Sequence, residues 1–172
     1  DGTAVVIFQP AEEGGGGGRE MCEAGLMERF CIQEVYGMQN WPDLEIGKFA
    51  IRPGPFFAAS DFFEITINGL GGHAAKPQIA VDPIIVGSHI VIALQSIVSR
   101  NADPTDQIVV SVTSFETSST AFNVIPQTVV LKGTVRTLSD ETRDLAEKRL
   151  EEIARKTGDV FGANVDPVYT RG

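Results

Sequence analysis

Cysteine and histidine are scarce in this chain, which has only two residues of each type among its 172. Cys22 and Cys31 belong to no Cys-x-x-Cys pair, so the sequence excludes a disulfide framework and predicts two buried free thiols. Free thiols are typical of a reducing compartment, and we therefore expect a cytoplasmic protein.

Positive charge is also in short supply. Lysine and arginine number 14 against 23 aspartates and glutamates, which gives a net charge of -9 and a pI near 4.7. This excess of negative charge opposes binding to nucleic acid or to an anionic membrane. We find no apolar stretch as long as a membrane span, and the first residues lack the basic and apolar segments of a secretory signal. Small molecules and other proteins are the expected partners.

The hydrophobic content of 42% is enough for a buried core, and the first third of the chain has an α/β pattern. The continuous apolar run 4–8 predicts a strand covered on both faces, followed by a helix over 19–30 and a second strand over 32–38. The chain does not begin with Met and opens directly into a strand, so we expect a piece of a longer protein. Prolines and glycines in the segment 41–60 predict an interruption, with a hinge near Ala58.

Beyond the hinge the pattern changes to alternating strands and amphipathic helices. The first of two helices has Asp82 as its expected N-cap and Pro83 in its first turn. The order strand, helix, strand, strand, helix, strand is that of the ferredoxin-like fold, an antiparallel sheet with both helices on one face. The expected strands cover 63–67, 108–115, 129–136 and 165–169, and the expected helices cover 82–99 and 139–161.

An acidic pair, Glu12-Glu13, directly follows the first expected strand and precedes five consecutive glycines. Parallel sheets bind ligands beyond the carboxyl ends of their strands, so chemistry is expected at this position. One carboxylate could bind a divalent cation while the other accepts a proton from water on that cation. The alternative is a solvated pair that caps the next helix. The glycine run lacks the Gly-Lys-Ser/Thr ending of a P-loop, so it does not predict a phosphate site.

Three polar residues beyond the hinge could contact a ligand, and each has an ordinary structural alternative. His73 lies in a Gly-Gly-His-Ala-Ala loop, which would let an imidazole approach a ligand closely or would form a turn with a solvated side chain. Asn123 lies between two strands in Asn-Val-Ile-Pro, where an Asx-turn is common. Arg136, on the polar face of a strand in Gly-Thr-Val-Arg-Thr, could hold a carboxylate through a bidentate contact or pair with a surface acid. His89 belongs to no motif and is expected to be a packed or edge-exposed helix residue.

The motifs occur together in one order: Gln-Pro-Ala-Glu-Glu-Gly, Gly-Gly-His-Ala-Ala, Asp-Pro-Ile, Asn-Val-Ile-Pro and Gly-Thr-Val-Arg-Thr. Over nearly its whole length the chain resembles the metal-dependent amidohydrolases that include hippurate hydrolase, N-acyl-amino-acid amidohydrolases and indole-acetyl-amino-acid conjugate hydrolases. The resemblance implies an α/β plus α+β architecture. A slice of a zinc-peptidase-like α/β domain over 1–57 would be followed by a ferredoxin-like lid and dimerisation domain over 58–172.

The resemblance also implies a role for each candidate residue. Glu12 matches the family's general base, and Glu13 matches a metal ligand. His73 matches a lid histidine that reaches the active site of the partner subunit and helps to stabilise the tetrahedral oxyanion. Asn123 and Arg136 match lid residues that contact the substrate, with the arginine holding the free carboxylate of the amino-acid half.

Gln39 departs from the family pattern, which has a histidine metal ligand at this position in Gly-Met-His-Asn-Trp-Pro. An amide oxygen is a poor substitute for imidazole at a zinc-like ion. The resemblance implies two divalent ions per subunit, of Zn, Mn, Co or Ni. The ligands in this chain, Glu13 and at best Gln39, cannot complete such a site.

The leading hypothesis is that the whole protein hydrolyses the amide bond of N-acyl or N-aroyl amino acids as a homodimer formed through the lid, and that this chain alone is inactive. One alternative is a degenerate homologue, marked by Gln39, that is retained for ligand binding or dimerisation. A second is a carboxypeptidase or deacylase of small peptides, because the same metal pair serves both reactions. A third is an isolated interaction domain whose sheet pairs with a copy of itself.

Overall fold

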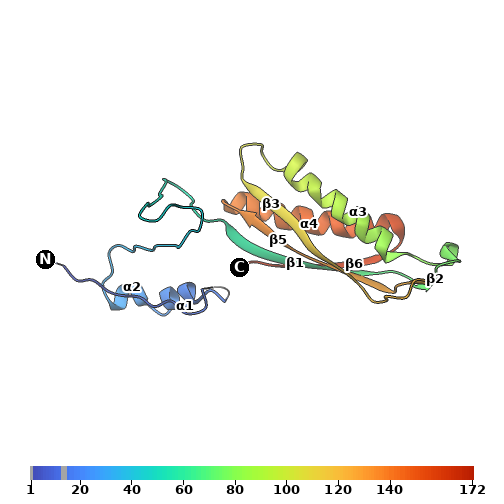
Figure 1. Ribbon diagram of the computed structural model, residues 1–172, viewed down its shortest axis with the longest axis horizontal. Helices are drawn as coiled ribbons and strands as arrows, with labels where there is room; N and C mark the ends of the chain where they lie inside the picture. The colour runs from blue at the N-terminus through green and yellow to red at the C-terminus, as the bar shows by residue number, and fades with distance from the viewer. Residues whose placement is uncertain (1, 13–14) are drawn as a thin grey trace. The chain divides into compact units, whose positions relative to one another are not determined.

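A computed structural model describes residues 2–12 and 15–172, and the chain divides into two compact units. The first unit comprises the chain up to Arg52 together with Gly172, and the second comprises Pro53–Arg171. Each can be followed separately in Figure 1. The sheet of the second unit begins at Ala59, next to the expected hinge at Ala58; the domain boundary itself stays a prediction.

The first unit contains two short helices, α1 (Gly17–Glu23) and α2 (Leu26–Arg29), and no strand among its described residues. The single helix expected over 19–30 is therefore wrong. Gly25 interrupts it with a left-handed backbone, φ 82°, which ends one helix and begins the next.

The strands expected over 4–8 and 32–38 are also wrong. Val6 and Phe8 are 75% and 86% exposed, and Met38 is 81% exposed. A strand needs a neighbour for its backbone hydrogen bonds, and neither segment has a partner strand within the described part of the chain. The two segments instead line a shared groove.

The expectation of buried thiols is wrong for a related reason. Cys22 and Cys31 are both exposed. Gly17 is the only buried residue of α1, and α2 has none, so these helices have no core in which to bury a thiol.

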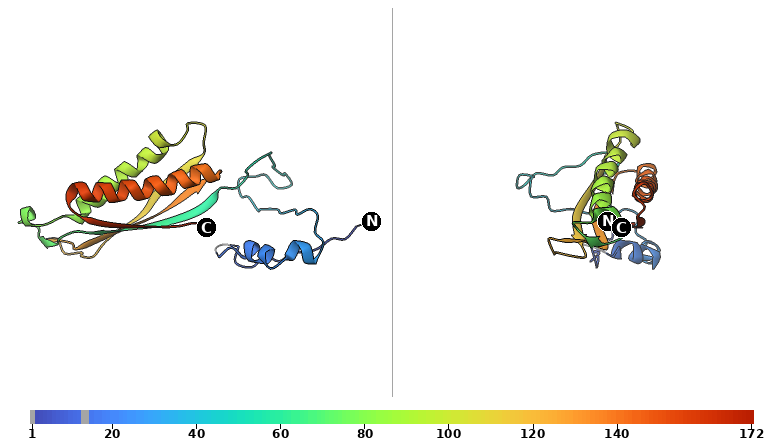
Figure 2. Two further views of the ribbon diagram at one scale, coloured as in Figure 1. Left: turned by 180° about the vertical axis from the view of Figure 1, so that it is seen from behind. Right: turned by 90° about the vertical axis from the view of Figure 1, so that its right-hand side faces the viewer.

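The second unit is a four-stranded antiparallel sheet with two long helices on one face (Figures 1 and 2). The strand order across the sheet is β3-β5-β1-β6, which confirms the predicted ferredoxin-like fold. Two very short strands form a separate pair at one end of this unit, visible at the β2 label in Figure 1. The main elements are β1 (Ala59–Asn68), α3 (Pro83–Ser96), β3 (Ile108–Thr117), β5 (Thr128–Thr137), α4 (Asp140–Phe161) and β6 (Asn164–Thr170), and the minor ones are β2 (Gly72–His73), η1 (Pro77–Ile79), the π-helical turn η2 (Ile97–Asn101) and β4 (Val124–Ile125).

The core lies between the sheet and the two helices. Alternate residues of β1 point into it, since Phe63, Ile65 and Ile67 are buried while Glu64 is exposed. A Cβ atom at Gly87 of α3 would lie only 2.9 Å from Cζ of Phe115, so a glycine lets this helix approach the sheet closely. The remaining fully buried core side chains come from α3, α4, β5 and the start of η2: Val86, Ile90, Leu94, Ile97, Val129, Leu131, Val135, Ala146, Leu150 and Ala154.

The predicted N-cap of α3 is confirmed, and α4 begins at the residue expected. Asp82 accepts a hydrogen bond from the backbone N–H of Ile84 at 2.9 Å, and Pro83 is the first residue of α3. Ser139 caps α4 by accepting from the N–H of Thr142 at 3.2 Å. These local signals explain why both long helices begin where the sequence indicates.

The expectation that no apolar stretch reaches the length of a membrane span is wrong. The helical segment Pro83–Asn101 is long and apolar enough to cross a membrane by length and composition. In the structure Val86, Ile90 and Leu94 are fully buried against the sheet. One side of this helix is therefore part of the core of the second unit.

Candidate active-site residues of the lid

His73 and Asn123 come together at one end of the second unit, although 50 positions separate them in the sequence. The short strands β2 and β4 pair antiparallel, with His73 opposite Val124. The N–H of Ala74 donates to the backbone carbonyl of Asn123 at 2.9 Å. Both candidate side chains are exposed. The structure therefore brings the backbones of His73 and Asn123 together and leaves both side chains exposed to solvent; we call this end the tip.

The imidazole of His73 has one defined hydrogen-bond partner. The backbone N–H of Ala75 donates to its Nδ1 at 3.1 Å. A nitrogen that accepts carries no proton, so the neutral ring holds its proton on Nε2. His73 therefore presents an N–H donor on the side of the ring away from the chain.

Gln127 holds the segment that leads to His73. Its side-chain Nε2 donates to the carbonyl of Gly69 at 2.6 Å, and its Oε1 accepts from the N–H of Gly71 at 3.0 Å. A Cβ at Gly71 would lie 2.9 Å from the carbonyl oxygen of Ile125, so a glycine is needed for this close approach. Gly71 of the motif thus allows the chain to pass close to the backbone of Ile125 on its way to His73.

Arg136 lies at the other end of the sheet, near the end of β5. It pairs with Ser60 of β1, where the chain enters the sheet; we call this end the hinge end. Its Nη1 donates to Oγ1 of Thr134 and to the carbonyl of Val135, the latter at 3.2 Å. Its guanidinium carbon lies 5.9 Å from the centroid of the Phe62 ring. This is a cation–π distance, and it places the guanidinium on the open face of the sheet.

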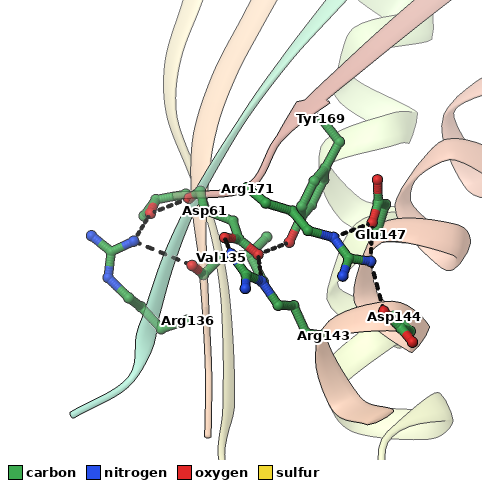
Figure 3. A network of polar contacts seen from close by, with 9 residues as sticks. Asp61, Val135, Arg136, Arg143, Asp144, Glu147, Tyr169 and Arg171 are labelled. Carbon is green, nitrogen blue, oxygen red and sulfur yellow. Dashed lines mark hydrogen bonds and ion pairs between the residues drawn. The ribbon is translucent and has the colours of Figure 1, made fainter. Parts of the chain in front are cut away.

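The opposite face of the sheet at the hinge end holds a buried ion pair (Figure 3). Asp61 is fully buried, and its carboxylate accepts from Nε and Nη2 of Arg143 at 2.9 and 2.5 Å and from the Tyr169 hydroxyl at 2.7 Å. The hydrogen bonds to Asp61 raise the pKa of Arg143. Burial, with the bond to Asp61, raises the pKa of Tyr169 above its ordinary value. Three elements, β1, α4 and β6, are joined through one carboxylate.

This network extends to the C-terminal end of the unit. Arg171 donates to Glu147, and to Asp144 at 2.6 Å, both on α4. Figure 3 shows these groups on the side of α4, whereas Arg136 points away from them. The hydrogen bonds to Glu147 and Asp144 raise the pKa of Arg171. The network is structural and leaves Arg136 on the other face.

The tip and the hinge end are far apart within one copy of the unit. Gln127, beside the tip, and Arg136 are nine positions apart on an extended segment, which spans roughly 30 Å at the usual rise of a strand. The ladder agrees, because β1 pairs Asn68 with Thr128 at one end and Ser60 with Arg136 at the other. One copy therefore brings His73 to Asn123 but not to Arg136.

The candidate metal residues lie in the first unit. Glu12 is exposed in a turn, Gln39 is exposed in an irregular segment, and Glu13 lies outside the described residues. Within residues 2–12 and 15–172 no group of three or more His, Cys, Asp and Glu side chains could hold a metal ion. Since a protein zinc site normally has at least three protein ligands, the described residues do not fit a complete site.

Three relevant residues of the second unit were missed by sequence reasoning. The sequence could have indicated Asp61, because it alternates in phase with the inward-facing Phe63 and Ile65. A carboxylate on a buried face requires a hydrogen-bonding or charged partner. Thr134 lies in the Gly-Thr-Val-Arg-Thr motif, but no role was predicted for it. Gln127 carried no signal, because its contacts depend on how the chain returns to Gly69 and Gly71.

Comparison with known proteins identifies the second unit. The family model described as a peptidase dimerisation domain, that of the M20 peptidases, matches residues 60–160, more than half of the chain. The chain belongs to this M20 family. An IAA-amino acid hydrolase, ILR1-like 4 of Arabidopsis thaliana, is 43% identical over 95% of the chain and 36% of its own length. The hippurate hydrolase of Campylobacter jejuni is 43% identical over 90% of the chain and 40% of its own length.

A solved structure agrees with these relatives. A Bacillus subtilis protein described as a dinuclear metal-binding peptidase from the M20 family matches 95% of the chain and 39% of its own chain, with a TM-score of 0.71 and 32% identity. The M20 chain described here thus spans about two fifths of the length of such relatives. Its second unit, Pro53–Arg171, contains the residues that match the peptidase dimerisation domain, and we refer to this unit as the lid, the name that the family resemblance gives it.

Proposed function

We propose that the whole protein is a metal-dependent amidohydrolase that cleaves the amide bond of N-acyl or N-aroyl amino acids. The similarity to hippurate hydrolase and to IAA-amino acid hydrolases supports this reaction class. The main structural support for this proposal is that the lid has both an accessible guanidinium and an exposed hydrogen-bond donor. Arg136 offers a guanidinium on an open face, and His73 offers an exposed N–H donor.

These side chains fit the two charges of the reaction. An N-acyl amino acid has a free carboxylate, which a guanidinium can hold through two parallel hydrogen bonds. Hydrolysis of its amide passes through a tetrahedral oxyanion, which the Nε2–H of His73 can stabilise as a donor. Asn123 would contact the substrate beside His73, since their backbones are linked through Ala74. Glu12 would serve as the general base.

The metal ions would bind at a site whose ligands are not all among the described residues. Glu13 remains the proposed ligand of this chain, and Gln39 occupies a position that usually holds a histidine ligand. Two divalent ions per subunit, of Zn, Mn, Co or Ni, would polarise the amide carbonyl and lower the pKa of bound water. The dinuclear Bacillus subtilis relative supports divalent ions in the whole protein.

The lid offers one open sheet edge for a homodimer. The edge strand β6 contains Pro167, which cannot donate a ladder hydrogen bond, and such a proline protects an edge. The opposite edge strand β3 has ten residues without proline or lysine. Next to it, α3 exposes Ile85 and Ile92, which are 50% and 71% exposed. We infer that β3 and α3 pair with their counterparts in a second copy.

Such a pairing would bring the tip of one copy to the hinge end of the other. Ile108 of β3 lies at the hinge end, opposite Thr137, and Thr117 lies at the tip end, opposite Val129. Two β3 strands related by a twofold axis run antiparallel, so the tip end of each lies beside the hinge end of its partner. The partner copy thereby supplies His73 and Asn123 to the Arg136 that they cannot reach within one copy.

Hydrolysis of N-benzoyl and N-acetyl amino acids by the whole protein tests this function. We expect metal-dependent cleavage that falls at least about a hundredfold in Glu12→Gln and in His73→Ala, because a general base and an oxyanion donor each contribute about that much. His89→Ala is the matched histidine control, since His89 stacks on Phe161 at 4.8 Å in the helical layer. Unchanged activity in Glu12→Gln would refute the role of Glu12.

Two alternatives give different outcomes in the same assays. A degenerate binding homologue would hold less than one metal ion per subunit after purification from metal-supplemented medium and would cleave no substrate. A deacylase or small-peptide carboxypeptidase would prefer N-acetyl substrates or dipeptides to N-aroyl amino acids. The similarity of the chain to an N-acetylcysteine deacetylase of Bacillus subtilis, 39% identical over 96% of the chain, favours the deacylase as second candidate.

A further inference from the structure

The guanidinium of Arg136 is held on one side only. Both hydrogen bonds that it makes come from Nη1, to Oγ1 of Thr134 and to the carbonyl of Val135 at 3.2 Å. These two acceptors match the two N–H groups of Nη1. Within the described part of the chain, Nε and Nη2 have no hydrogen-bond partner. The free edge, Nε–H and Nη2–H, is one that can grip both oxygens of a carboxylate.

Thr134 sets this orientation through the direction of its own hydrogen bonds. Its hydroxyl donates to the backbone carbonyl of Asp61 at 2.8 Å. A hydroxyl has one proton, so once that proton is given to Asp61 the oxygen can only accept. A guanidinium can only donate, and Nη1 of Arg136 is therefore a matched partner. A valine at this position would have the same shape but no acceptor.

The carbonyl that orients Thr134 is itself fixed. The Asp61 side chain is held from the helical face by Arg143 and Tyr169, at 2.5 to 2.9 Å. Because β1 and β5 are hydrogen-bonded neighbours at this point, this anchor keeps the carbonyl of Asp61 in place beneath Thr134. The buried ion pair on one face thus supports an arginine on the other.

We propose that Thr134 is a positioning residue for substrate binding: its hydroxyl fixes Nη1 of Arg136, which leaves the Nε and Nη2 edge free for the substrate carboxylate. The ligand class is an acyl compound with a free α-carboxylate. This inference rests on the proposed function. It adds the residue that orients Arg136 toward the substrate carboxylate.

Steady-state kinetics of Thr134→Val and Thr134→Ser in the whole protein test the proposal. Thr134→Val should raise KM for an N-acyl amino acid about tenfold, the scale of a lost hydrogen bond to a charged group, with kcat changed less than about twofold. Thr134→Ser keeps the hydroxyl and should have the wild-type KM. For the corresponding N-acyl amino amide, which has no carboxylate, wild type and Thr134→Val should have equal KM. An equal rise for both substrates, or a rise in Thr134→Ser, would overturn the proposal.

Two further measurements keep the proposal testable if a variant is unstable or inactive. In an Arg136→Ala background, adding Thr134→Val should raise KM no further, since the group that it positions is gone. Separately, the Nη protons of Arg136 should give distinct NMR signals in wild type and Thr134→Ser, and averaged signals in Thr134→Val. Averaged signals in the wild type would contradict the proposal. If the spectra behave as expected but no N-acyl amino acid is cleaved, the proposed function fails while the positioning of Arg136 stands.

Discussion

The two units of this chain respond differently to similar sequence signals. In the lid, β1 finds hydrogen-bonded neighbours on both sides, β5 and β6, and its Ile65 and Ile67 are fully buried. In the first unit, an equally apolar run leaves Val6 75% and Phe8 86% exposed. An apolar run therefore specifies a strand only where partner strands complete its backbone hydrogen bonds.

The largest effect is expected from a side chain added where the lid sheet is tightest. A Cβ at Gly133 would lie 2.2 Å from Cζ of Phe63 and 2.2 Å from the carbonyl oxygen of Ser111. Gly133→Val should lower the free energy of unfolding by about 4 kcal/mol or more, measured by urea denaturation. A Cβ at Gly37 of the first unit meets nothing within 4 Å, so Gly37→Ala should change it by less than about 0.5 kcal/mol. Similar effects at both positions would contradict the conclusion that close packing at Gly133 distinguishes the lid from the first unit.

Truncation of one phenylalanine in each unit tests the same difference in burial between the two units. Phe63 of β1 is 3% exposed, and Phe63→Ala should cost about 3–5 kcal/mol of stability through lost burial and a cavity. Phe8 is 86% exposed, and Phe8→Ala should stay within about 0.5 kcal/mol. Thermal and urea unfolding of this chain would measure both. A cost for Phe8→Ala near that of Phe63→Ala would mean that the first unit has a core of its own.

Ion pairs should differ between the units in the same way. Asp61→Asn leaves the Arg143 guanidinium without its carboxylate in a buried place and should cost about 3 kcal/mol. Glu45 and Lys48 form an exposed pair in the first unit, with side chains 76% and 63% exposed. Glu45→Gln should cost less than about 0.5 kcal/mol, and salt should remove even that. Equal costs for the two substitutions would show that burial does not decide the value of these pairs.

The smallest expected effect is a dependence on alkaline pH. Burial and the bond to Asp61 raise the pKa of Tyr169 above the ordinary value of 10.0. Because the folded lid holds this proton more firmly than the unfolded chain, the stabilisation is complete below about pH 10 and is lost as the pH rises through the raised pKa.

Unfolding measured between pH 9 and pH 12 should therefore show a shallower loss of stability in Tyr169→Phe than in wild type. Tyr36 of the first unit, which is exposed and bonded to Glu34, is the matched control. Tyr36→Phe should leave the pH dependence of lid unfolding unchanged. A wild-type slope in Tyr169→Phe would show that its hydroxyl does not contribute.

Most of the lid could be predicted from sequence because its signals are local and its partners lie in the same chain. The alternation of apolar and polar residues in β1 and β5 predicted which side of each strand is buried. Asp82 and Ser139 predicted where the two long helices begin. The apolar pattern of residues 4–38 gave a wrong prediction of buried strands. Such strands need neighbouring elements that cover both of their faces, and the described residues of the first unit do not provide them.

The candidate site was predictable as a set of residues but not as a geometry. A two-residue strand has no alternation, so nothing in the sequence shows that β2 and β4 bring His73 beside Asn123. Nor does a motif show that Arg136 lies at the far end of the sheet from them. The acceptor role of Thr134 depends on the neighbouring strand, through the carbonyl of Asp61.

The most direct test of the two-copy site is complementation in mixed dimers of the whole protein. His73→Ala and Arg136→Ala subunits, each with strongly reduced activity as homodimers, are mixed, and the dimer with one copy of each is purified through two different tags. If His73 of one copy works with Arg136 of the other, one of the two equivalent sites is intact, and the mixed dimer should have about half of the wild-type kcat per dimer. A mixed dimer no more active than its two parents would contradict a site shared between two copies.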